Sequence, residues 1–104
     1  MPYVLVSGVL RNARHPNTFE IPDAADKRAL QVGDFVKLGF TATGDDVRPG
    51  FKGDFTERMW VCITSPGQGR LDNKPSELTC VALGDTVAFE PYHILAIVKA
   101  DELA

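Results

Sequence analysis

The sequence predicts a small α+β domain, with a strongly curved, mainly antiparallel sheet of roughly five or six strands and one short helix. The sheet is expected either as an open sheet or as an open barrel. Two observations predict this class. Short apolar runs with alternating side chains recur along the chain, and turns rich in Gly and Pro separate them. One stretch alone, residues 23–30, is typical of a helix, and a helix of about two turns must pack on a sheet to be stable.

The N-terminal part predicts a strand followed by a connector. Residues 3–10, YVLVSGVL, are short and rich in branched apolar residues, which favours a strand with a bulge or a close backbone approach at Gly8. Residues 11–22 contain turn formers and two prolines and are expected to be extended. Within this connector Phe19 and Ile21 alternate, and we expect both to pack on the core.

The predicted helix has recognisable ends. Asp23 is a suitable N-cap, and Gly33 ends the element. Between them Ala25, Ala29 and Leu30 form a narrow apolar stripe, which predicts the face that packs on the sheet.

Two runs alternate strictly and predict the main strands. In DFVKLGF, one face carries Val36, Leu38 and Phe40, and the other carries Phe35, Lys37 and Gly39. In ERMWVCIT, one face carries Met59, Val61 and Ile63, and the other carries Arg58, Trp60, Cys62 and Thr64. Each run is therefore expected to have one core face and one opposite face.

The segment between these strands, residues 41–56, has many turn formers and no period, and predicts a long loop. Its Phe51 and Phe55 are expected either to fold back on the core or to meet a partner. RPGFKGDF, within this loop, lacks the order of a phosphate-binding loop and does not open a helix.

The C-terminal part predicts further short strands and turns. SPGQG is a tight turn, and strands are expected in RLDN, ELTCVAL, TVAFE with Val87 and Phe89 inward, and HILAIV. The tail KADELA is expected to be frayed. Gly33-Asp34 and Gly84-Asp85 are similar turns that lead into strands, without the surrounding match that a repeat requires.

Size and composition bound the class of protein. The 104 residues, 44% hydrophobic and 24% charged, correspond to one globular domain, residues 1–104. No apolar stretch approaches the roughly 20 residues that cross a bilayer, and no signal peptide is recognised. We therefore expect a cytoplasmic protein without membrane contact, with Cys62 and Cys80 reduced. A disulfide between them is the alternative.

The charge and the sparse metal ligands exclude further classes. A net charge of −3 with no Lys/Arg run argues against nucleic-acid binding and favours a basic partner. His15 and His93 lie far apart, and neither cysteine belongs to a C-x-x-C pair, so no metal site and no cofactor are expected. His93 is expected to pack or to cap, and a Cys-His hydrolase lacks the required spacing.

Trp60 is the sharpest functional candidate, because it shares a face with Arg58. In one interpretation Trp60 lies buried beneath the helix 23–30, with one edge near the surface beside Arg58. In the other it is a partly exposed anchor for a partner, since Trp and Arg dominate interface hot spots.

Four further polar residues are candidates around Trp60. Arg58, Arg70 and Asp72 are expected to form one polar cluster across the SPGQG hairpin, either as an exposed salt bridge or as a rim around Trp60. Asn73 is expected to be a turn former, with a ligand-contacting role as the alternative. Together with Phe51 and Phe55, these residues form the candidate partner-binding set.

Five sequence pieces, in order, carry a resemblance to a known family. They are NTFEIP, LQVGDFVKLGF, ERMWVCIT, GRLDNKP and LGDTVAFEPYHILAI. Over residues 17–97 the chain resembles the YegJ-like small bacterial domains of unknown function and their immunity-protein-like relatives. The resemblance implies a compact α+β domain without known catalytic activity, and some similar families are suspected of neutralising toxins. The cysteines and the loop 41–56 are not part of the pattern.

The sequence thus predicts a non-catalytic protein-binding domain rather than an enzyme. Its sharpest form is an immunity-type protein that occludes a toxin through the face of Trp60 and Arg58 and the loop 41–56. The alternative is a small-ligand or regulatory module that uses the concave face of the sheet. Both a monomer and a dimer paired through an edge strand remain open.

Overall fold

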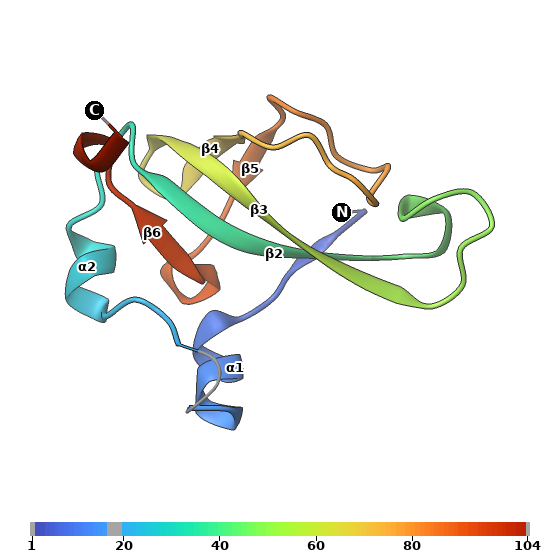
Figure 1. Ribbon diagram of the computed structural model, residues 1–104, viewed down its shortest axis with the longest axis horizontal. Helices are drawn as coiled ribbons and strands as arrows, with labels where there is room; N and C mark the ends of the chain where they lie inside the picture. The colour runs from blue at the N-terminus through green and yellow to red at the C-terminus, as the bar shows by residue number, and fades with distance from the viewer. Residues whose placement is uncertain (1, 17–19, 104) are drawn as a thin grey trace.

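The fold is a curled antiparallel sheet, a half-barrel, with short helices beside it (Figure 1), which confirms the predicted class. The computed structural model describes residues 2–16 and 20–103. In chain order the elements are β1 (Val4–Leu5), α1 (Gly8–Arg14), α2 (Ala24–Arg28), β2 (Phe35–Thr43), η1 (Gly44–Asp46), β3 (Asp54–Ser65), β4 (Gln68–Leu71), β5 (Thr86–Ala88), η2 (Pro91–His93), β6 (Ala96–Val98) and η3 (Ala100–Leu103), where η marks a 3₁₀ helix.

The six strands follow the order β1-β2-β3-β4-β5, and β6 also pairs with β2. β1 and β6 share one edge of β2, because β1 pairs with Phe40 and Thr41, whereas β6 pairs with residues 35–37. All nine residues of β2 pair with β3, so these two strands form a long ribbon along the molecule (Figure 1).

The core lies within the curl of the sheet, on the side that alternation predicts. Val36, Leu38 and Phe40 of β2 are fully buried, as are Val61 of β3 and Val87 of β5. Residues at alternate positions of a strand point to one face, so one side of every long strand faces this core. The predicted core faces of both alternating runs are therefore confirmed.

Two turns with the same hydrogen bonds lead into β2 and β5, at residues 31–34 and 82–85. In each, the Asp carboxylate accepts the N–H three residues earlier at 2.9 Å, and the Asp N–H donates to that residue's carbonyl at 3.0 Å. The Gly has φ of 96° in one turn and 90° in the other, in the left-handed region that favours glycine. Each turn also exchanges two backbone bonds with a neighbouring residue, Ile63 or Leu71. The two Gly-Asp units thus share one geometry.

Asp34 continues from its turn into a buried ionic contact. Its side chain is 4% exposed and accepts Lys99 Nζ at 2.6 Å and the Ala100 N–H at 2.8 Å. Lys99 Nζ also donates to the carbonyl of Ala29 at 2.9 Å. The C-terminal segment is therefore tied to the start of β2 and to the end of α2, and the expectation of a frayed tail is wrong.

The strand predicted over residues 3–10 is confirmed only at β1, Val4–Leu5, and is wrong beyond it, because helix α1 begins at Gly8. The Ser7 hydroxyl accepts the Leu10 N–H at 3.1 Å, a cap that stabilises a helix by about 1 kcal/mol. Val9 and Leu10, whose apolar character favoured a strand, are 47% and 48% exposed. The close approach at Gly8 is confirmed, since a Cβ there would lie 2.8 Å from the Ile94 carbonyl oxygen.

Helix α2 confirms the predicted helix in position but not in packing. Asp23 occupies the N-cap position, although its side chain makes no capping bond. Ala25 and Ala29 of the expected stripe are exposed, and only Leu30 packs against the core. This helix of five residues is thus held at its C-terminal end rather than along a face. Phe19, expected to pack on the core, lies outside the described residues.

The long loop is shorter than predicted, because β2 runs to Thr43 and β3 begins at Asp54. Phe51 and Phe55 fold back on the core, with ring centroids 6.4 Å apart in an edge-to-face arrangement. The strand predicted in residues 77–83 does not form, and that segment is irregular.

Replacing Asp34 by Ala is expected to lower the free energy of unfolding by about 2–4 kcal/mol, because three donors lose a buried acceptor. Urea unfolding of Asp34→Ala beside Asp101→Ala, an exposed carboxylate on η3, measures the effect. A midpoint for Asp34→Ala equal to that of Asp101→Ala would contradict the role assigned to this contact.

Candidate functional site

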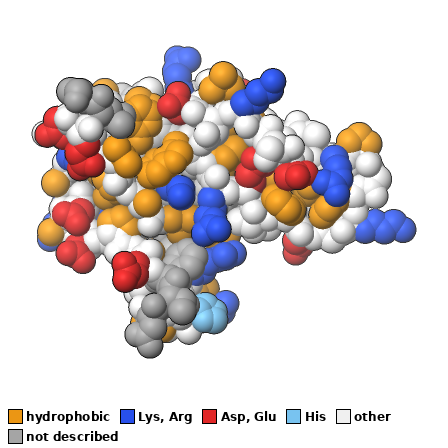
Figure 2. Space-filling model, in the orientation of Figure 1, with side chains coloured by type: hydrophobic (Ala, Val, Ile, Leu, Met, Phe, Trp, Pro, Cys, Tyr) orange, Lys and Arg blue, Asp and Glu red, His pale blue; other side chains and the backbone are white. Residues whose placement is uncertain are grey.

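Side chains that point away from the core form one surface across β6, β2, β3 and β4, which we call the Trp60 face. It comprises Phe35, Lys37, Arg58, Trp60, Cys62, Arg70, Asp72 and Val98. The strand register brings them together, since Val98 lies opposite Phe35, Phe35 opposite Cys62, and Cys62 opposite Arg70. Hydrophobic side chains gather over these strands in Figure 2, with Lys and Arg side chains beside them.

Trp60 is half-buried, and neighbouring strands rather than a helix surround it. Lys37, its partner on β2, places Nζ 5.2 Å from the centroid of the indole ring, within the range of a cation–π contact. Phe35, Asp72 and Val98 line a shallow hollow of about 290 Å³ with Trp60. The interpretation that Trp60 lies beneath the helix is wrong, because α2 lies beside core-facing side chains instead.

Backbone contacts fix the position of Trp60 after β4 has ended. The Asp72 N–H donates to the Trp60 carbonyl at 2.9 Å, and the Trp60 N–H donates to Oδ1 of Asn73. The Asn73 side chain thus continues the hydrogen bonding of a strand that stops at Leu71. Asn73 therefore positions Trp60 rather than simply forming a turn, and its ligand-contacting role stays a prediction.

The charges of the Trp60 face are mainly positive. Lys37, Arg58 and Arg70 oppose the single carboxylate of Asp72, which gives three positive charges against one negative charge. Across residues 2–16 and 20–103 the ion pairs are Arg48–Glu77 and Lys99–Asp34. The predicted cluster of Arg58, Arg70 and Asp72 therefore shares a face but contains no ion pair, and its cations face solvent.

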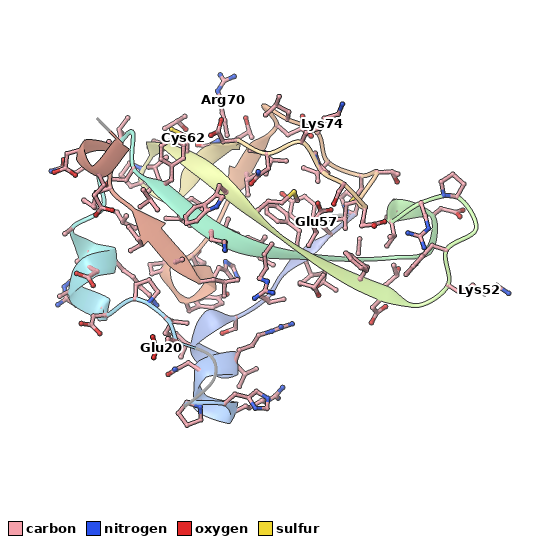
Figure 3. All side chains as sticks on the ribbon, viewed as in Figure 1. Glu20, Lys52, Glu57, Cys62, Arg70 and Lys74 are labelled. Carbon is pink, nitrogen blue, oxygen red and sulfur yellow. The ribbon has the colours of Figure 1, made fainter. Side chains whose placement is uncertain are left out.

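Phe51 and Phe55 do not join this face. Trp60 lies six residues along β3 from Asp54, a separation of about 20 Å. In Figure 3 Lys52 projects from the tip of the loop, whereas Cys62 and Arg70 lie toward the other end of β3. Arg48 stacks over the Phe51 ring at 4.7 Å, so both aromatic rings belong to the packing of the loop.

Glu57 is an important residue that the sequence reasoning missed. Its carboxylate accepts the N–H groups of Ser76 (2.7 Å), Glu77 (3.1 Å) and Leu78 (3.1 Å), and the Ser76 hydroxyl at 2.9 Å. Burial raises the pKa of Glu57, but these hydrogen bonds outweigh burial and hold the pKa below its ordinary value. The available signal was the position of Glu57, which alternates with the core residues Met59 and Val61, so the pattern places its carboxylate on the core side of β3.

Cysteine and histidine chemistry has little support in the geometry. Both cysteines are free thiols, and burial together with the charge of Asp46 raises the pKa of Cys80, which keeps that thiol protonated. His93 accepts the Glu90 N–H at Nδ1 (2.9 Å), and burial lowers the pKa of the imidazole. The expected capping role of His93 is confirmed.

Comparisons of the chain with protein-family models, curated proteins and solved structures give no match. The resemblance to YegJ-like domains therefore stays a prediction from the sequence. Among the side chains that the structure describes, no three His, Cys, Asp or Glu are grouped as metal ligands. Within the same residues no helix has the length and apolar character to cross a membrane.

Replacing Glu57 by Gln is expected to lower the free energy of unfolding by about 1–3 kcal/mol at pH 7, because an amide cannot accept all four bonds. The native chain should also lose stability as the pH falls from 4.5, the ordinary value for Glu, through the lower folded pKa. The variant lacks this component, so its unfolding free energy should depend less steeply on pH in that window.

Urea unfolding at several pH values between neutral and acid measures both effects, with Glu20→Gln, an exposed carboxylate, as the matched control. Equal pH slopes for the Glu57→Gln variant and the native chain would show that Glu57 has no special ionisation in the folded state.

Proposed function

We propose that the chain is a non-catalytic protein-binding domain that docks its partner on the Trp60 face. The observation that supports this most is the placement of a half-buried Trp60 at the centre of an apolar surface with cations on either side. Trp and Arg are the residue types that dominate binding hot spots. The Lys37, Arg58 and Arg70 side chains make no ion pair among the described residues. Arg58 and Arg70 are exposed, and Lys37 lies over the Trp60 ring, so all three charges are presented beside the indole.

The partner's contacting surface is proposed to be acidic, with an apolar side chain that enters the hollow beside Trp60. The net charge of −3 favoured a basic partner, yet the charges of the Trp60 face have the opposite sign. Contacting groups feel local charges most strongly, since charges beyond about 10 Å are screened at ordinary salt. Charge complementarity over this face would then speed the encounter and weaken with added salt.

In its finer form, the proposal is an immunity-type protein that occludes a toxin. The resemblance of residues 17–97 to immunity-protein-like relatives supports this form. A toxin recognised in this way would present carboxylates rather than a basic patch to the Trp60 face. The loop 44–53 lies outside the proposed contact, because its Phe51 packs on the core of this chain together with Phe55 of β3.

A pull-down from native lysate with the tagged chain tests the proposal, beside the variants Trp60→Ala, Arg58→Ala and the control Lys52→Ala. We expect one protein partner in stoichiometric amount, whose binding weakens about 30-fold in Trp60→Ala and about 5-fold in Arg58→Ala. Lys52→Ala removes the same charge from the distant loop and should bind as the native chain does.

Two outcomes would overturn the proposal. One is that no protein is captured from the chain's own cells or from a neighbouring competitor. The other is that a captured partner binds Trp60→Ala as tightly as the native chain. Near-UV circular dichroism of Arg58→Ala and urea unfolding of Trp60→Ala establish that the variants are folded, and Trp60→Phe serves as the milder change.

A further inference from the structure

A second hollow, of about 530 Å³, lies on the core side of the sheet, between α2, the β3–β4 turn and η2. Core side chains that are already covered, Ile63, Phe89 and Ile94, close its floor. Its accessible apolar wall consists of Leu30, Val32, Pro66 and Pro91. Its volume falls within the usual range of small-molecule sites, about 300–1,000 Å³. The hollow shares no residue with the Trp60 face.

The charged side chains that line this hollow are both cations, Lys27 and Arg28 of α2. Neither forms an ion pair with any other residue that the structure describes. This is notable in a chain that carries 14 acidic and 11 basic residues. An accessible apolar wall with cations beside it has the chemistry to hold an apolar chain that ends in an anion.

A neighbouring hollow extends this surface. Lys27, Arg28 and Pro91 line both hollows, and the second one adds Val9 of α1 and Tyr92 of η2. Val9 and Tyr92 are 47% and 49% exposed, so apolar surface continues past the two cations. Lys27 and Arg28 thus lie between two apolar regions. A ligand carboxylate at this position pairs with the two cations while the ligand's alkyl chain packs in one of the apolar regions.

We propose that this hollow binds an amphipathic carboxylate, whose carboxylate meets Lys27 and Arg28 and whose acyl chain packs on the accessible apolar wall of Leu30, Pro66 and Pro91. The anion follows from the sign of the lining charges, and the acyl chain follows from the apolar wall. This site is separate from the proposed protein contact, so either can exist without the other.

Isothermal titration calorimetry with decanoate, below its micelle concentration, tests the proposal. We expect one saturable site, and dodecanoate should bind about 15-fold more tightly than decanoate, because two further methylenes are buried. Nonylamine, which has the same nine-carbon alkyl chain as decanoate and the opposite charge, and decylamine, which is one carbon longer, should both bind at least tenfold more weakly than decanoate.

Decanoate binding by variants of the lining residues tests where the ligand binds. Lys27→Ala/Arg28→Ala should weaken decanoate binding at least tenfold, whereas Lys52→Ala/Lys74→Ala, which removes the same charge elsewhere, should leave it unchanged. Val32→Trp, at a rim residue that is 65% exposed, should block the hollow without a change in charge. Amide shifts in NMR spectra of the native chain should centre on Gly67 and Phe89, which line the hollow.

Absence of saturable decanoate binding would overturn the proposal. So would equal binding of either amine, equal binding by the Lys27→Ala/Arg28→Ala variant, or amide shifts centred on the Trp60 face. The NMR map uses the native chain and therefore decides the location even where a variant unfolds. A positive pull-down through Trp60 bears on the protein contact alone and leaves this test unaffected.

Discussion

The buried carboxylate of Asp34 is the contact on which both candidate sites depend. It accepts the N–H that closes the turn before β2, and it also binds Lys99 and the Ala100 N–H just after β6. Because β6 pairs with residues 35–37, this contact holds Val98 opposite Phe35 on the Trp60 face. Lys99 also bonds to the carbonyl of Ala29 at the end of α2, and α2 supplies the cations of the second hollow. Replacing both partners of a buried ion pair by apolar residues is often neutral in stability, whereas removing one partner is destabilising, so Asp34 is needed both for geometry and to satisfy its three donors.

Glu57 anchors the irregular segment between β4 and β5, as Asp34 anchors the C-terminal segment. The residues between β4 and β5 form no strand, so the N–H groups of residues 76–78 have no strand partner to bond with. One carboxylate accepts three successive N–H groups there, which keeps the segment against β3 and buries Leu78 at 4% exposure. A small half-barrel lacks enough strands to cover its own core, so carboxylates hold the remaining cover in place.

The sequence was sufficient where structure depends on local alternation and insufficient where it depends on distant partners. Strict alternation placed Phe35 and Lys37 opposite the core face of one run and Trp60 opposite the core face of the other, and the register of β2 and β3 brings the three together. The pairing of Val98 with Phe35 joins residues far apart in the chain, and no local pattern encodes it. At residues 8–14 a single Ser7 cap outweighed an apolar run that alternation could not distinguish from a strand. The cover of Trp60 was misjudged for the same reason, since the direction of a short helix depends on contacts at its ends.

The acidic and basic residues of the chain have different roles, which the net charge does not show. Asp34, Asp85 and Glu57 accept backbone N–H groups, so part of the negative charge is committed to holding turns and segments. The cations of the Trp60 face and of the second hollow have no such structural partners among the described residues. A chain of charge −3 therefore presents locally positive surfaces, each beside apolar side chains. Both surfaces would select anionic groups, and they differ in shape: the Trp60 face is an open surface suited to a macromolecule, whereas the second hollow reaches the core and suits a single chain.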